Sequence, residues 1–177
     1  MKEFRNLIVL GPLIYAIHHF EEHIIFNFRE WRLTYFSDNN AISTEEVLIR
    51  LIAALLMVVC VHLVKNNRGS AHVVLLFLMT TQVVNALFHI LFSFYFSDFS
   101  PGAITAVLLY LPVNVLIVRA AFQEGLLKNY FELCLLFALG MSIFVLFEII
   151  GPIVMTFTLL FLPLYYLMVN KLDGKRV

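Results

Sequence analysis

The stretch Tyr15-Ala16-Ile17-His18-His19-Phe20-Glu21-Glu22-His23 decides how this chain folds. It holds three histidines and two acids within six positions of an otherwise apolar segment. An ionisable group at mid-depth in a bilayer costs about 2.5 kcal/mol or more, so such groups turn towards the interior of a helical bundle and mark a functional site. We therefore expect the remaining helices to surround this cluster.

Composition predicts a polytopic membrane protein. Of the 177 residues, 62% are hydrophobic and 15% aromatic, and the mean hydropathy is +0.92. Apolar runs recur along the whole length, as in membrane bundles. Twelve Lys and Arg balance twelve Asp and Glu, so the chain has no excess of positive charge that would favour a nucleic-acid partner. The expected partner is the lipid bilayer. No repeat or linker divides the chain, so we expect a single transmembrane domain over residues 1–177.

We expect an all-α bundle of six membrane spans. At about 1.5 Å per residue, each candidate helix is long enough to cross or nearly cross a hydrocarbon core about 30 Å thick. The expected spans are residues 4–28, 47–64, 72–96, 103–122, 130–150 and 153–169. If Gly151-Pro152 is only a kink, the count falls to five. Gly11-Pro12 should kink the first span, because proline removes a backbone donor.

The segments between the spans read as connectors. Residues 29–46 are polar and include Trp31 and Tyr35, which is typical of an interfacial loop with an aromatic belt. Ser43 is the expected N-cap of the second span. Residues 65–70 form a short, turn-rich connector between the second and third spans.

The distribution of cations predicts that both termini lie in the cytoplasm. With that orientation the cytoplasmic segments carry nine cations, and the opposite side carries Arg29, Arg32 and Arg50. The nine are Lys2, Arg5, Lys65, Arg68, Arg119, Lys128, Lys171, Lys175 and Arg176. This excess is the one that the positive-inside rule requires, and we expect a bacterial plasma membrane as the location.

Three separate spans carry polar groups at a similar depth. With this topology His18 to His23, then Asn85 with His89, and finally Glu148 all fall in the outer half of the bundle. His18 and Glu22 share one helical face, and Asn85 and His89 share another. We expect these two faces to meet. His19 and His23 form a second pair, rotated by about 100° from the first.

Imidazole and carboxylate groups in a water-poor pocket predict a divalent metal site. The expected ligands are His18, Glu22 and His89, and Glu148 is either a further ligand or an interfacial acid. Glu21 is a further ligand, a partner that hydrogen-bonds a ligand and orients it, or a general base. The supporting residues are Tyr15, His19, His23 and Asn85. Zinc, iron and manganese all suit these donors.

The leading functional hypothesis is a metal-dependent membrane enzyme, an oxidoreductase or a hydrolase, that acts on a lipid-like or small apolar substrate. The same groups would also serve a proton- or metal-coupled transporter or channel. A non-catalytic membrane scaffold is the third possibility. Isolated polar residues such as Gln82, Thr105 and Asn114 are expected to bridge helices.

The motifs also resemble a known family. His18-x-x-Glu21-Glu22 resembles the defining motif of the HXXEE family of polytopic membrane proteins, and His89 resembles its further histidine. Phe99-Ser100-Pro101-Gly102 resembles its Tyr-x-Pro-Gly string, with Phe99 in place of the tyrosine. The resemblance implies a site containing His18, Glu21, Glu22 and His89. It implies no particular activity, and Phe99 argues against a catalytic tyrosine hydroxyl at that position.

Overall fold

The computed structural model describes residues 3–37 and 43–174, and in these ranges every regular element is a helix. Lys2, Lys175 and Arg176, three of the cations predicted to be cytoplasmic, lie outside the described residues. The elements in chain order are α1 (Glu3–Leu7), α2 (Leu10–Phe20), η1 (Glu21–Ile25), α3 (Phe28–Tyr35), α4 (Thr44–Lys65), α5 (Arg68–Leu78), η2 (Met79–Val84), α6 (Asn85–Phe96), α7 (Ala103–Thr105), η3 (Ala106–Tyr110), α8 (Leu111–Gln123), α9 (Tyr130–Ile150) and α10 (Ile153–Gly174), where η denotes a π-helix.

Within the described ranges, five continuous helical stretches are long and apolar enough to cross a membrane. They are Thr44–Lys65, Arg68–Phe96, Ala103–Gln123, Tyr130–Ile150 and Ile153–Asp173. The protein is therefore an all-α polytopic bundle, as predicted. Gly151 has φ +93° and separates α9 from α10, so Gly151-Pro152 is a turn and not a kink.

The N-terminal segment is not among these five, because its helix is interrupted between α1 and α2. Pro12 has no N–H to offer the carbonyl of Ile8, and that carbonyl accepts a hydrogen bond of 3.0 Å from Gly11 instead. The expected kink therefore lies one turn before the proline. Pro112 likewise follows the π-helix η3, which begins six residues earlier.

Two connectors are more ordered than the composition predicts. Residues 29–46 do not form a simple loop, because α3 occupies Phe28–Tyr35 and the side chain of Asn27 accepts a hydrogen bond from the Glu30 N–H. The third span begins at Arg68, four residues earlier than expected, because Asn67 and Ser70 form a capping box. Ser43 caps α4 as predicted, accepting from the Glu46 N–H.

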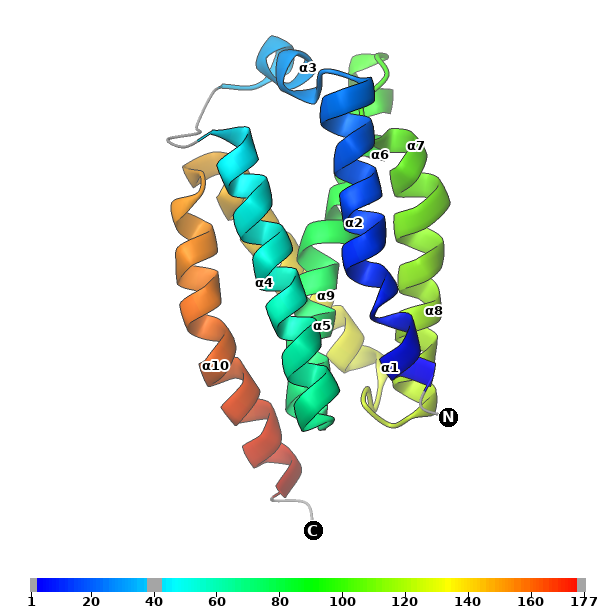
Figure 1. Cartoon of the computed structure of the whole chain (residues 1–177), viewed down its shortest axis with the longest axis vertical. Coiled ribbons are helices and arrows are strands. Elements are labelled where there is room, and N and C mark those ends of the chain that lie inside the picture. Colours follow the sequence, from blue (N-terminus) through cyan, green and yellow to red (C-terminus); the bar gives the residue numbers. More distant parts are fainter. Residues whose placement is uncertain (1–2, 38–42, 175–177) are drawn as a thin grey trace.

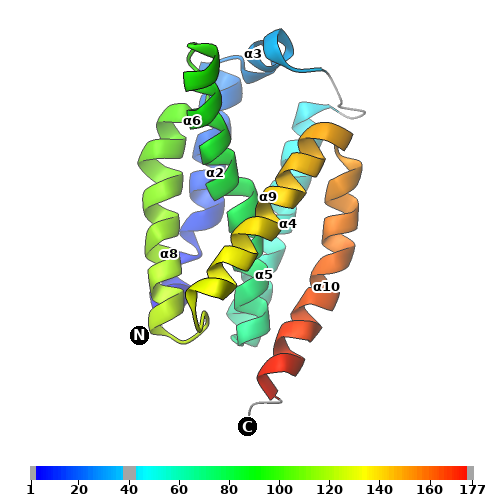
Figure 2. The same ribbon diagram turned by 180° about the vertical axis from the view of Figure 1, so that it is seen from behind.

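The helices run alongside one another around the long rod α5–η2–α6 (Figure 1). Both described chain ends lie at one end of the bundle, and α3 with the turn between α6 and α7 lies at the other (Figure 1). Helix α9 is strongly tilted: it starts beside α8 and finishes beside α10 (Figure 2). Because of this tilt, the end of α9 lies beside α10 (Figure 2).

Candidate metal centre

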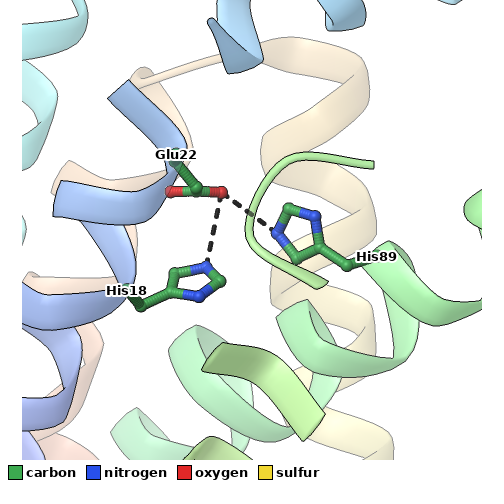
Figure 3. A group of neighbouring side chains, drawn as sticks. All are labelled: His18, Glu22 and His89. Atoms are coloured by element: carbon green, nitrogen blue, oxygen red, sulfur yellow. Dashed lines mark ion pairs between the residues drawn. The ribbon is translucent and has the colours of Figure 1, made fainter. Parts of the chain in front are cut away.

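Three buried side chains from two separate parts of the chain meet in the half of the bundle away from the termini. His18 comes from the end of α2, Glu22 from η1 and His89 from α6, and each is at most 2% exposed. One oxygen of Glu22, Oε1, lies 3.3 Å from Nε2 of His18 and 3.0 Å from Nε2 of His89 (Figure 3). The two helix faces that the spacing predicts to face each other therefore do meet here.

Both histidines are held through their other ring nitrogen. Nδ1 of His18 lies 2.8 Å from the Thr105 hydroxyl, and that hydroxyl donates to the carbonyl of Gly102 at 3.3 Å. The hydroxyl proton is thus engaged, so His18 donates from Nδ1 and leaves a lone pair on Nε2. Nδ1 of His89 lies 2.9 Å from the hydroxyl of Ser100. Histidine ligands of metals are oriented in this way.

The facing Nε2 atoms have no hydrogen-bond partner among the described residues. Both are fully buried, and their short contacts with Glu22 do not have hydrogen-bond geometry. Two atoms that each bind a metal at about 2.0–2.2 Å, at an angle of about 90–110°, lie roughly 2.8–3.6 Å apart. The distances of 3.0 and 3.3 Å fall in this range, so the residues fit a shared cation.

Gly102 packs directly over the cluster. A Cβ at this position would lie 2.8 Å from Cε1 of His18, 2.9 Å from Cγ of Glu22 and 3.0 Å from Cε1 of His89. Its φ of +96° also favours glycine. Phe99, three residues earlier, is 45% exposed and its ring contacts that of Phe26 instead. The motif therefore contributes backbone and the Ser100 hydroxyl to the site.

Glu21 has a different role from its neighbour. Its carboxylate accepts hydrogen bonds from the backbone N–H groups of Gly102, Ile104 and Thr105, at 3.2, 3.2 and 2.7 Å. These N–H groups belong to the N-cap residue Gly102 and to the first turn of the helical stretch Ala103–Gln123, where an acidic group is stabilised by the helix dipole. The expected general base is thus occupied in joining η1 to this helix.

A second histidine pair lies on the other side of Glu22. Oε2 of Glu22 is 2.6 Å from Nδ1 of His19 and 3.8 Å from Nε2 of His23. The ring of Tyr15 packs edge-on against His19, with centroids 4.3 Å apart. Asn85 has a buried Oδ1 without a hydrogen-bond partner among the described residues.

These groups line a cavity of about 170 Å³. Tyr15, His19, Glu22, His23 and Asn85 are among its polar lining residues, together with Arg29, Arg32, Thr44, Thr80, Thr81, Glu148 and Thr158. Apolar residues of α4, α9 and α10 supply a large part of the wall, among them Val47, Leu48, Leu51, Ile143, Phe144, Phe147, Met155, Leu159 and Leu162. Glu22 therefore stands between two buried imidazoles and an apolar chamber.

Glu148 does not join the cluster. Its Oε2 accepts hydrogen bonds from Nε and Nη2 of Arg32, at 3.3 and 3.0 Å, on the wall of the cavity. Glu148 lines the same cavity as Glu22, but the tilt of α9 carries its end sideways towards α10 (Figure 2). Glu148 thus anchors α3 and is not a ligand of the His18–Glu22–His89 group.

Helix α3, outside the five candidate spans, covers the site. The ring of Phe28 packs edge-on against His89 and His23, with centroids 5.3 and 6.1 Å apart. Tyr35 donates a hydrogen bond of 2.9 Å to Asp98, which raises the pKa of the Tyr35 phenol. This helix therefore helps to separate the cluster from water.

Ser100, Thr105 and Tyr110 also belong to the site, although the sequence does not predict this role for any of them. Ser100 lay within a recognised motif, and Thr105 follows that motif by three residues, so the motif itself was the available signal. The ring of Tyr110 packs against that of His18 at a tilt of 35°, with centroids 4.3 Å apart, and its buried hydroxyl has no hydrogen-bond partner among the described residues. Nothing in the apolar run around Tyr110 distinguishes it in the sequence.

Comparison with known proteins agrees with the resemblance noted in the motifs. A family model described as "Protein of unknown function with HXXEE motif" matches residues 9–117, more than half of the chain. The matched region contains His18, Glu22, His89 and the loop that orients them. No curated protein and no solved structure matches the chain.

Proposed function

The chain belongs to the HXXEE family, and from its own site we propose that it is a membrane enzyme that holds a divalent metal between His18, Glu22 and His89. Zinc, iron and manganese all suit two imidazoles and a carboxylate. Such an ion acts as a Lewis acid or lowers the pKa of a bound water. We further propose that both termini lie on the cytoplasmic side, in keeping with the excess of cations there.

One observation carries the metal proposal: two buried Nε2 atoms converge on one carboxylate oxygen without hydrogen-bond geometry. The lone pair on Nε2 of His18 and the charge on Glu22 repel each other unless a cation lies between them. A buried polar atom without a partner costs about 1–3 kcal/mol, so the arrangement favours cation binding.

The cavity supports an apolar or lipid-like substrate. Its walls on α4, α9 and α10 are mainly aliphatic and aromatic, and its polar lining residues include Glu22, His19 and His23. A substrate with a hydrocarbon chain would bury that chain between these helices and present its polar group to Glu22. Such a division of polar and apolar groups is typical of small-molecule sites.

The core below the site favours an enzyme over a transporter. About two helical turns from His18 and His89, towards the termini, Gln82 donates to the Gly11 carbonyl at 2.9 Å, and Asn114 donates to Gln82 at 2.8 Å. These amides bridge helices, as expected for isolated polar residues. Below them Ile8 and Ile117 are fully buried, which suits a closed catalytic pocket better than an ion path.

Metal analysis of tag-free protein purified in detergent tests the proposal. After loading with Zn²⁺, Fe²⁺ or Mn²⁺ and gel filtration, we expect stoichiometric metal in the wild type and loss of the ion held by His18 and His89 in His89→Ala. His62→Ala is the matched control, because His62 is also buried but contacts Ser70 at 2.9 Å. Wild-type protein without stoichiometric metal would overturn the proposal.

Substitutions of the adjacent acids Glu21 and Glu22 add a comparison to the same metal analysis. Glu22→Gln should lose the metal, because it removes the charge between the imidazoles. Glu21→Gln should keep the metal but unfold more easily, because it weakens hydrogen bonds to three backbone N–H groups. Mass spectrometry of lipid extracts incubated with metal-loaded wild type and with Glu22→Gln then tests turnover. Identical products from both proteins would contradict an enzymatic role.

A further inference from the structure

The second histidine pair forms a distinct group next to the first. His19 lies near the end of α2, and Glu22 and His23 lie in η1. The rings of His19 and His23 are nearly parallel, with an interplanar angle of 7° and centroids 5.7 Å apart. One ligand atom from each of His19, Glu22 and His23 lies within 4.8 Å of the others.

The two oxygens of Glu22 divide the histidines between them. Oε1 contacts Nε2 of His18 and of His89, whereas Oε2 lies nearest to His19 and His23. In two-metal sites the ions are about 3.5–4 Å apart, and a carboxylate that uses one oxygen for each ion spans such a distance. Glu22 has the surroundings of a bridging ligand.

The contacts of His19 include an ion pair with Glu22 and ring contacts with Tyr15 and His23. Both of its ring nitrogens are buried and make no hydrogen bond among the described residues, although Nδ1 lies 2.6 Å from Oε2 of Glu22. This contact is somewhat shorter than two ligands of one metal require. A small rotation of the imidazole, towards the cavity that it lines, would open the space.

We propose that His19, Glu22 and His23 hold a second divalent metal ion, and that Glu22 bridges it to the first. This inference rests on the proposed function, because it uses the same carboxylate. The first ion, between His18, Glu22 and His89, is the inner one, because Gly102 packs over these residues and His18 and His89 do not line the cavity. The outer ion faces the apolar cavity, where the polar group of a substrate can reach it. The outer ion is thus the one that contacts the substrate.

The number of metal ions per chain tests this inference. Tag-free protein loaded with Zn²⁺ and freed of excess metal should retain two equivalents, and His23→Ala should retain one. His18→Ala with His89→Ala should also retain one, and Glu22→Ala should retain fewer than one. His62→Ala, outside both groups, should still retain two.

Electron paramagnetic resonance of the Mn²⁺-loaded protein provides an independent readout. Two Mn²⁺ ions bridged by Glu22 should give a coupled spectrum, which changes to that of an isolated ion in His23→Ala. One equivalent in both wild type and His23→Ala, with an uncoupled spectrum, would overturn the second site and leave the first intact. Wild type without metal would instead overturn the proposed function. The wild-type stoichiometry decides the matter even if a variant fails to fold.

Discussion

Glu21 and Glu22 are neighbours in the chain, yet their carboxylates serve different parts of the bundle. Glu22 faces four imidazoles, whereas Glu21 receives three backbone N–H groups at the start of the helical stretch Ala103–Gln123. The hydrogen bonds of Glu21 hold the Gly102 turn against the cluster of Glu22 and its imidazoles. At the scale of single residues, therefore, one acid positions the loop that encloses the other acid.

Substitution of Gly102 tests this enclosure. We expect Gly102→Ala to lower the free energy of unfolding by about 3 kcal/mol or more, because strain at positive φ adds to overpacking against the site. Gly125→Ala is the control: φ is +70°, but nothing lies within 4 Å of the new Cβ, so only about 1–2 kcal/mol of backbone strain is expected. Thermal unfolding in detergent measures both. Equal losses would contradict close packing of Gly102 on the cluster.

Helical irregularities position the groups at the scale of elements. The π-helix η1 contains Glu21, Glu22 and His23, and η2 lies in the same rod as His89, just before α6. Single π turns change the rotational phase of the residues that follow and are frequent at functional sites. The contact between η2 and α9 is close, because a Cβ on Gly140 would lie 3.1 Å from the backbone nitrogen of Thr80.

A larger residue at Gly140 should therefore separate α9 from η2. We expect Gly140→Val to destabilise the protein by about 1–3 kcal/mol through overpacking. Ala138→Val, on the exposed side of the same helix, should change stability by about 0.5 kcal/mol or less. Denaturation in matched detergent micelles compares the two variants. A Gly140→Val protein as stable as Ala138→Val would rule out tight packing at this crossing.

The whole molecule places its functional groups asymmetrically along the bundle. The described chain ends lie at one end, and α3 and the turn between α6 and α7 lie at the other (Figure 1). The cluster comes from the end of α2, from η1 and from α6, and Gly102 in that turn packs on it. Polar groups near the termini act structurally: His72 contacts Tyr165 and the Leu126 carbonyl, at 3.2 and 3.0 Å, and Asn170 accepts from the Gly69 N–H. The site is therefore expected on the side of the membrane opposite the termini.

Accessibility of the two termini checks this arrangement. We expect protease-cleavable tags at both ends to be cut from the same side of sealed, uniformly oriented vesicles. The reason is that the interrupted N-terminal segment runs the same length of the bundle as its neighbours (Figure 1). A tag added beside α3, after residue 37, should show the opposite accessibility. Cleavage of the two terminal tags from different sides would disprove the predicted orientation.

The sequence by itself determined the helical class, most helix boundaries, and the meeting of His18 and Glu22 with His89. Apolar run length, capping residues and spacing along one helix carry this information, since they depend on local geometry. Only the tertiary structure decided that Glu148 pairs with Arg32, that Glu21 caps a helix, and that Ser100 and Thr105 orient the histidines. Helix tilt and the shape of the turn at Gly102 control these contacts, and both result from packing between distant segments.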